Sequence, residues 1–506
     1  MLKLIFATTQ STVGKIQKDH AINISILFFS VIVAWHKILS HTFLGEGYWY
    51  ILNGLGEGKI TRIFTHDLGA ILLFNLIKPV FADNFFFYQL FALISFVLIG
   101  ALFYFFVYEL TGRKEIGLIA AVLFAVNFTT SLEMLGLGSY QNFAQRVFFL
   151  ILLLPSFILF LKFKKNKNIL YYFFSLLLSG LSSFFAQFSL FYLVFFGVLA
   201  FTTLISVRSK LKKAFVDSFL IFLVFAVGVF VIYFPVFLGL SSFIPKQSLF
   251  VYIFSNFDSV IFHSLRQLVI ITVPEGILKI IFSTSGPLHK EGMQLLFIPS
   301  VLIYLFAGIF LYKKERALRI ALLTSLFFLP LIFIFNMYLR GDNVDHLGPG
   351  SRYLFAPSMG FAIFWAISFS YIIGKKKRWL IYPLIAGWIV IQIISINREL
   401  EKENYKFVAT KKIVSYIKEK ISPKLHEDSI VIVPNMMGTW GARFCKLFYG
   451  MSNTLFLPLY DQIEWIGEYG RPFDPTKDIV LDYDFKNDEV VDVTKDYKKI
   501  IIDKND

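Results

Sequence analysis

Long apolar runs dominate this chain of 506 residues and constrain its fold more than any other feature. An α-helix needs about 17–25 apolar residues to cross the hydrocarbon core of a bilayer. Eleven runs meet this length, at about 21–39, 85–108, 116–132, 145–161, 169–184, 185–206, 216–239, 294–312, 320–337, 352–373 and 380–397. Apolar residues make up 57% of the chain and charged residues only 16%. These proportions exclude a soluble protein and a disordered chain, so an all-α polytopic membrane protein is expected.

Three of the runs allow more than one interpretation. The fifth and sixth are continuous in the sequence, and Gly180-Leu181-Ser182-Ser183 predicts where they divide. The first run follows Lys3, Lys15 and Lys18, as the apolar part of a signal peptide would, but no cleavage site of small residues follows it. We therefore expect the first run to remain as the first span.

The Lys and Arg residues gather in every second connection between the runs. Residues 1–397 contain 32 of them, and 21 lie in six short segments, at 1–20, 109–115, 162–168, 207–215, 313–319 and 374–379. Cytoplasmic connections of membrane proteins carry such an excess. The pattern predicts a cytoplasmic N-terminus in a multi-pass protein of the plasma (cytoplasmic) membrane. The net charge of +15 then reports orientation, and no nucleic-acid partner is expected.

The segment 248–291 is apolar but contains Asp258, Arg266, Glu275 and Lys279. The alternation of basic connections requires it to cross the membrane either twice or not at all. We expect amphipathic or re-entrant helices on the outer face, and two short spans are the alternative.

The last part of the chain has a different character. Residues 398–506 contain 17 basic and 19 acidic residues. A helix is predicted over 405–420, strands over 429–433 and 454–457, and a frayed end over 482–506. The expected domains are a cytoplasmic segment at 1–20, a transmembrane domain at 21–397 and a small extracytoplasmic α/β domain at 398–506. A single cysteine, Cys445, excludes a disulfide within one chain.

The first outer loop, 40–84, contains the strongest catalytic candidate. Glu46 lies between two glycines, just before Tyr48-Trp49-Tyr50, and Asp67 follows Arg62 further along the loop. A carboxylate that is partly desolvated at the membrane interface is suited to act as a general base. The alternative is an ordinary loop acid beside a belt of interfacial aromatic residues.

Two further outer loops contain charged residues. One includes Glu133 and ends at Arg146, where a span begins, and the other includes Arg340, His346 and Arg352. An arginine at the interface can bind a lipid phosphate in a bidentate manner, or it can extend toward water or form local ion pairs. His346 has no partners at metal-ligand spacing, and the chain lacks serine hydrolase and zinc protease motifs.

Several segments together resemble the GT-C glycosyltransferases, in particular bacterial and archaeal relatives of the protein O-mannosyltransferases. The resemblance covers about residues 20–400 and rests on their order and topology. The segments are Phe43-Leu44-Gly45-Glu46, Leu110-Thr111-Gly112-Arg113, Ala121-Val122-Leu123-Phe124-Ala125-Val126-Asn127, Leu132-Glu133-Met134 and Ser351-Arg352-Tyr353-Leu354-Phe355-Ala356-Pro357-Ser358. Gly47 follows Glu46 where the family often has a second acid, and the Trp-Trp-Asp-Tyr-Gly motif of the oligosaccharyltransferases is absent.

The resemblance implies a polyprenyl-phosphate sugar donor and inverting transfer on the outer face. It also implies interfacial helices in the first outer loop. Glu46 matches the family's general base, and Asp67 is a second carboxylate candidate. Arg352, Arg146 and Arg62 are the candidates for binding the donor phosphate, whereas Glu133, Arg340 and His346 are assigned to acceptor binding or loop structure.

Other functions and partners stay open. The acceptor can be a protein, a lipid or a glycan, membrane lipid is an expected partner, and a requirement for Mg²⁺ or Mn²⁺ is left undecided. A transporter or lipid flippase is the alternative from another class, although the chain shows no repeated halves. A polysaccharide polymerase or ligase of similar topology is a further alternative.

Overall fold

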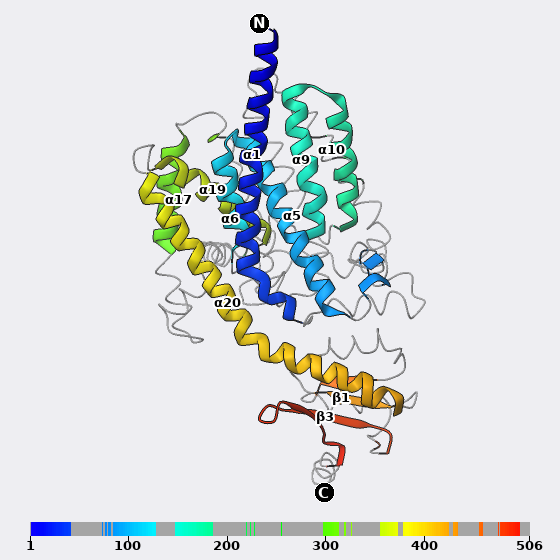
Figure 1. Cartoon of the computed structure of the whole chain (residues 1–506). Helices are drawn as coiled ribbons and strands as arrows, with labels where there is room; N and C mark the ends of the chain where they lie inside the picture. Colours follow the sequence, from blue (N-terminus) through cyan, green and yellow to red (C-terminus); the bar gives the residue numbers. More distant parts are fainter. Residues whose placement is uncertain are drawn as a thin grey trace.

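The structure is a computed structural model in which helices predominate and a small sheet lies near the C-terminus (Figure 1). It describes residues 2–41, 73, 76–77, 79–81, 84–127, 147–185, 219, 223, 227, 255, 297–312, 318–319, 325, 355–372, 378–424, 429–433, 455–458, 474 and 476–495. Two of the described helices are long and apolar enough to cross a membrane, over Lys18–Ser40 and Phe85–Thr111. They contain the runs expected as spans at 21–39 and 85–108.

The first helix, α1 (Leu2–Trp35), includes residues 2–20 of the segment that was expected to precede the first span. Its N-terminal part projects beyond the other helices in Figure 1. A short 3-10 helix, η1 (His36–Ser40), continues the chain to His41.

The ends of α5 (Phe85–Thr111) follow from its flanking residues. The Asn84 side chain accepts a hydrogen bond from the Phe86 N–H, which supplies an N-terminal cap. Gly112 has a φ of 71°, a left-handed conformation that ends the helix and that glycine adopts without a steric cost.

The helix expected over 116–132 is shorter in the structure. α6 (Lys114–Ala125) has 12 residues, about 18 Å at 1.5 Å per residue, and the chain turns at Val126 and Asn127. The prediction of a helix through these two residues is therefore wrong. The indole Nε1–H of Trp35 donates to the Ala125 carbonyl at 2.9 Å, so a side chain from another helix satisfies a C-terminal carbonyl of α6.

Helices α9 (Phe149–Asn166) and α10 (Ile169–Ser182) form an antiparallel hairpin. α10 ends at Ser182 and a 3-10 turn, η3 (Ser183–Phe185), follows. The end of α10 lies within Gly180-Leu181-Ser182-Ser183, the segment predicted to divide the apolar run. Residues 186–206, the remainder of that run, lie outside the described residues.

Helices α17 (Phe297–Tyr312) and α19 (Phe355–Ile372) agree closely with the runs at 294–312 and 352–373. They contact each other through Trp365, whose indole N–H donates to the Tyr304 hydroxyl at 3.2 Å. The runs at 216–239 and 320–337 and the segment 248–291 lie outside the described residues, apart from five isolated positions.

The last apolar run belongs to a much longer helix. α20 (Arg378–Tyr416) has 39 residues and continues into a π-helical turn at Ile417–Ile421 and a 3-10 turn at Ser422–Lys424. The run at 380–397 and the helix predicted over 405–420 are thus one element. The domain division expected after residue 397 falls inside this helix, because no glycine or proline interrupts the chain between residues 388 and 422.

A four-stranded mixed sheet follows α20, with the strand order β2-β1-β3-β4. β1 (Ile430–Val433) pairs in parallel with β2 (Leu455–Pro458) and with β3 (Ile479–Asp484), and β3 pairs antiparallel with β4 (Glu489–Asp492). The strands predicted at 429–433 and 454–457 are confirmed to within one residue.

The prediction of a frayed end from residue 482 is wrong for residues 482–495. β3 and β4 form a hairpin there, and the Asp484 carboxylate accepts hydrogen bonds from the N–H groups of Lys486 and Asn487. Asp484 is thus a turn residue that satisfies backbone donors in the tip of the hairpin.

One end of the helical part is defined by charged contacts between helices, and we call it the basic end. Lys114 Nζ lies 3.1 Å from Asp19 Oδ2, and Lys165 Nζ lies 2.6 Å from Glu109 Oε2. These contacts join α1 to α6 and α5 to α9. Two further contacts bring α19 and α20 to the same end: the Arg113 guanidinium lies 4.5 Å from the Tyr371 ring centroid, and the Tyr382 hydroxyl donates to Glu115 at 2.7 Å.

The opposite end, next to the sheet, is the sheet end. It contains the last turn of α1 with η1, the N-terminus of α5 and the C-terminus of α6. Phe148, just before α9, stacks with Phe91 of α5, at 5.7 Å between ring centroids. Helices α1, α5, α6, α9 and α10 therefore run alternately between the two ends, and α20 leaves them at the sheet end (Figure 1).

Candidate functional site

The sheet end is the candidate functional site, and its organisation begins with Trp35. This indole is fully buried, donates to the Ala125 carbonyl and lies edge-on to the Phe96 ring at 6.2 Å. A single side chain thus holds together the ends of α1 and α6 and the middle of α5. These contacts of Trp35 fix the position from which η1 begins.

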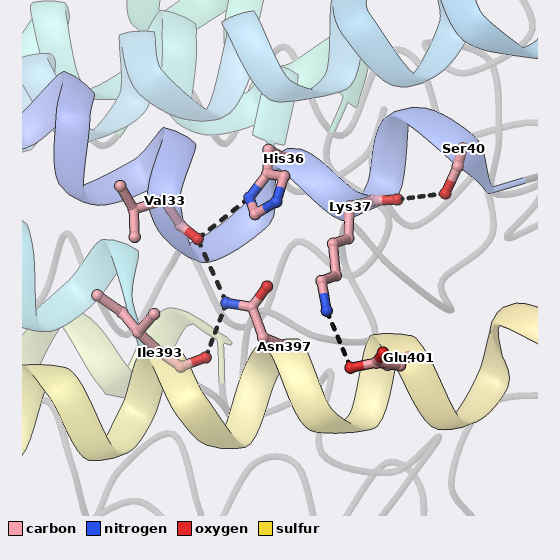
Figure 2. A network of polar contacts seen from close by, with 7 residues as sticks. All are labelled: Val33, His36, Lys37, Ser40, Ile393, Asn397 and Glu401. Atoms are coloured by element: carbon pink, nitrogen blue, oxygen red, sulfur yellow. Dashed lines mark hydrogen bonds and ion pairs between the residues drawn. The ribbon is translucent and has the colours of Figure 1, made fainter.

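Helix α20 fixes the next turn of the chain through the polar network of Figure 2. The Asn397 amide donates to the Val33 carbonyl at 3.3 Å and to the Ile393 carbonyl of its own helix at 3.0 Å. Four residues further along α20, Glu401 pairs with Lys37 at 3.0 Å. The Val33 carbonyl also accepts a hydrogen bond from His36 Nδ1, at 3.3 Å.

His41, the last described residue before residue 73, lies against the same helix. Its ring is buried and stacks on the Phe407 ring, with the centroids 3.9 Å apart and the planes 11° apart. Lys411 donates to the carbonyl of the preceding residue, Ser40, at 2.5 Å. Burial lowers the pKa of Lys411, because the ammonium group has lost part of its hydration. We call the contacts of Val33, Lys37, Ser40 and His41 with α20 the α20 clamp.

The next residue of α20 faces the sheet. Lys412 Nζ lies 2.6 Å from Asp488 Oδ2 in the β3–β4 turn and also donates to the Asp488 carbonyl at 2.7 Å. The Asp488 carboxylate in addition accepts a hydrogen bond from the Tyr483 hydroxyl. The hydrogen bond with Lys412 and then that with Tyr483 lower the pKa of Asp488, and the same pairing raises the pKa of Lys412. Lys411 therefore joins α20 to η1, and the adjacent Lys412 joins α20 to the sheet.

All eight residues predicted for the site lie outside the described residues. They are Glu46, Arg62, Asp67, Glu133, Arg146, Arg340, His346 and Arg352. Their described neighbours in the sequence do lie at the sheet end. His41 and Asn84 flank the loop of Glu46, and Asn127 and Val147 flank the loop of Glu133 and Arg146. Phe355, three residues after Arg352, begins α19, which runs from there toward the basic end.

The α20 clamp was not foreseen from the sequence. Asn397 offered a signal, since an amide at the end of an apolar run needs a hydrogen-bond partner. The partners of His41 and Lys411 lie more than 360 residues away, so no local pattern could indicate them. The clamp positions the backbone and contains no paired nucleophile and base.

Within the described part of the chain, no group of three or more His, Cys, Asp or Glu side chains could hold a metal ion. Comparison with models of known protein families and with curated proteins finds no match to this chain.

Proposed function

We propose that the chain is a multi-pass membrane glycosyltransferase that uses a polyprenyl-phosphate sugar as donor. Membrane insertion is supported by large apolar side chains exposed along one face of several helices. In α1, Ile22, Ile26, Phe29 and Val33 are exposed at helical spacing, and in α17 the same holds for Ile298, Leu302, Leu305 and Ile309. Water would disfavour such continuous apolar surfaces, whereas acyl chains would cover them.

The proposed orientation rests on the basic end. It contains Arg113, Lys114 and the four lysines of 162–167, which belong to connections predicted to be cytoplasmic. The sheet end would then face the outside of the cytoplasmic membrane, together with the C-terminal sheet.

The observation that carries the catalytic proposal is the convergence of flanking residues at the sheet end. Glu46 follows the clamped His41 by five residues, which limits the separation of their Cα atoms to about 18 Å. Arg146 immediately precedes Val147, and Arg352 precedes α19 by three residues. An acidic residue and two arginines would thus be anchored at one face of the membrane, where a lipid phosphate lies.

The proposed reaction is an inverting displacement. Glu46 accepts the proton of an acceptor hydroxyl, and the hydroxyl oxygen forms a bond to the anomeric carbon of the donor sugar. The bond between that carbon and the phosphate oxygen breaks, and polyprenyl phosphate leaves with the bonding electrons. Arg352, Arg146 and Arg62 stabilise the charge on the phosphate, and Asp67 is the second carboxylate candidate. A divalent metal would need only one or two of these carboxylates.

Glu46→Gln tests this proposal in membranes incubated with a panel of labelled polyprenyl-phosphate sugars. We expect a loss of at least 100-fold in transfer, because the amide cannot accept the proton. Glu419→Gln, an exposed acid on the turn after α20, is the matched control and should transfer sugar at the wild-type rate.

Three outcomes would contradict the proposal. If Glu46→Gln transfers sugar at the wild-type rate, Glu46 is not the base. If the wild-type protein moves labelled lipid across the membrane without forming a new glycosidic bond, it is a flippase or transporter. If it only joins preassembled glycan chains, it is a polymerase or ligase.

A further inference from the structure

The hairpin of α9 and α10 buries serine side chains between its two helices. Ser156 Oγ of α9 donates to the Ser175 carbonyl at 2.7 Å, and Ser175 Oγ of α10 donates to the Ser156 carbonyl at 2.8 Å. Ser179 and Ser182, one and two turns further along α10, are also buried. The serine face of α10 is therefore its contact with α9.

The opposite face of α10 is apolar. Ile169, Phe173, Leu177 and Leu181 repeat every fourth residue, and their side chains are 42 to 66% exposed. Leu170 and Phe174 widen this stripe and are also exposed. A helix at the surface of a water-soluble protein would have the reverse arrangement, so the stripe is suited to contact acyl chains.

The turn between the two helices is strongly basic and lies beside the stripe. Lys162, Lys164, Lys165 and Lys167 lie within six residues, and Asn168 caps α10 directly before the exposed Ile169. Residues 147–185 contain no Asp or Glu. Glu109 of α5 pairs with Lys165 at 2.6 Å.

Two of these lysines are held over aromatic rings. Lys164 Nζ lies 5.2 Å from the Phe160 ring centroid, and Lys167 Nζ lies 5.9 Å from that of Phe163. Lys167 also adopts a left-handed backbone conformation, with a φ of 59°, which turns the chain into α10. The ring contacts bring cations to the boundary at which the apolar stripe begins.

We propose that this basic turn binds the headgroups of anionic phospholipids while the apolar stripe of α10 contacts their acyl chains. The charge favours this occupant, because the turn contains four lysines and residues 147–185 contain no Asp or Glu. The arrangement would select anionic lipid at one leaflet. The inference rests on the proposed membrane insertion but not on sugar transfer.

The test uses the full-length protein, purified in a neutral detergent and titrated with phosphatidylglycerol or phosphatidylcholine. Native mass spectrometry measures the ratio of their association constants. We expect the wild-type protein to prefer phosphatidylglycerol and Lys164→Gln/Lys167→Gln to lose about 30-fold of that preference, about 5-fold per lysine. Lys420→Gln/Lys424→Gln removes the same charge at the sheet end and should retain the preference.

Three results would overturn the inference: equal binding of both lipids by the wild-type protein, an unchanged preference in Lys164→Gln/Lys167→Gln, or an equal loss in the control variant. Thermal unfolding in phosphatidylcholine nanodiscs checks the fold, since both double variants should melt there with the wild type. Alkaline carbonate extraction of membranes tests insertion separately. Release of the chain would refute insertion, whereas retention without lipid preference would refute this inference alone.

Discussion

The two ends of the helical part differ in the balance of their contacts. At the basic end most contacts join two side chains, as in Lys114 with Asp19 and Lys165 with Glu109, and Lys165 also donates to the Glu109 carbonyl. At the sheet end the Lys37–Glu401 ion pair is accompanied by side chains that reach backbone carbonyls of other elements, as in Trp35 with Ala125, Asn397 with Val33 and Lys411 with Ser40. The contacts with backbone carbonyls fix the course of the backbone itself. The chain is therefore positioned most closely where it enters the loop that contains the proposed catalytic acid.

Removal of Trp35 should have the largest effect at the sheet end. Trp35→Ala deletes a fully buried indole and its hydrogen bond to Ala125, and we expect a loss of about 3–5 kcal/mol in the free energy of unfolding. Denaturation in detergent measures the change. Trp379→Ala, at a tryptophan that is 70% exposed at the basic end, should change stability by less than about 0.5 kcal/mol. Equal losses in the two variants would contradict the assigned role of Trp35.

Near the basic end, α5 and α6 approach each other closely at Gly117 of α6. A Cβ at this position would lie 3.0 Å from the Tyr104 carbonyl oxygen and 3.1 Å from its ring. Gly117→Ala should therefore destabilise the protein by about 1–3 kcal/mol, because α5 and α6 must separate. Gly387→Ala of α20 is the control, since nothing lies within 4 Å of its Cβ position. We expect this control to be neutral or stabilising in the same denaturation assay, and a matching loss there would contradict the prediction.

The contact between α20 and the sheet should depend on pH. The folded-state pKa of Asp488 is lowered and that of Lys412 is raised, so the pair contributes its full stability between about pH 4 and pH 10. The contribution should be lost as the pH falls through the folded-state pKa of Asp488, and again as it rises through that of Lys412. In thermal unfolding followed by circular dichroism, Asp488→Asn should melt below the wild type at pH 7 and approach it near pH 2. A constant difference over this range would refute the assignment.

The smallest effects concern two ion pairs, one from each end. The Glu109 side chain is 13% exposed in its pair with Lys165, whereas Glu401 is 74% exposed in its pair with Lys37. Both coupling energies should lie below about 1 kcal/mol, and the first should be the larger because water screens it less. Double-mutant cycles with Lys→Met and Glu→Gln measure both values. A larger coupling for Lys37 and Glu401 would reverse this part of the comparison.

The sequence predicted the elements whose signals are local. Apolar runs indicated α5, α17 and α19 to within a few residues, because a helix in an apolar environment needs a continuous run of such side chains. β-branched residues indicated β1, and the Gly-Ser segment indicated the end of α10.

The predictions were wrong where contacts with residues distant in the sequence determine the structure. α6 ends early where the indole of Trp35, 90 residues away, satisfies the Ala125 carbonyl. The residues 482–495 are ordered because Asp484 closes a turn and Lys412 pairs with Asp488. Composition suggested a solvated tail there, since it does not show which acidic residues have partners. The residues proposed for catalysis remain predictions from the sequence, anchored at described neighbours.

Glu46 should lie at the face of the membrane on which the sheet end lies, opposite the basic end. Single cysteines at positions 46, 420 and 166, introduced after Cys445→Ser, test it in intact cells with a membrane-impermeant maleimide. Positions 46 and 420 should react from outside, and position 166 should react only after permeabilisation. Labelling of position 46 together with position 166, and not with position 420, would contradict the proposed location of the active face.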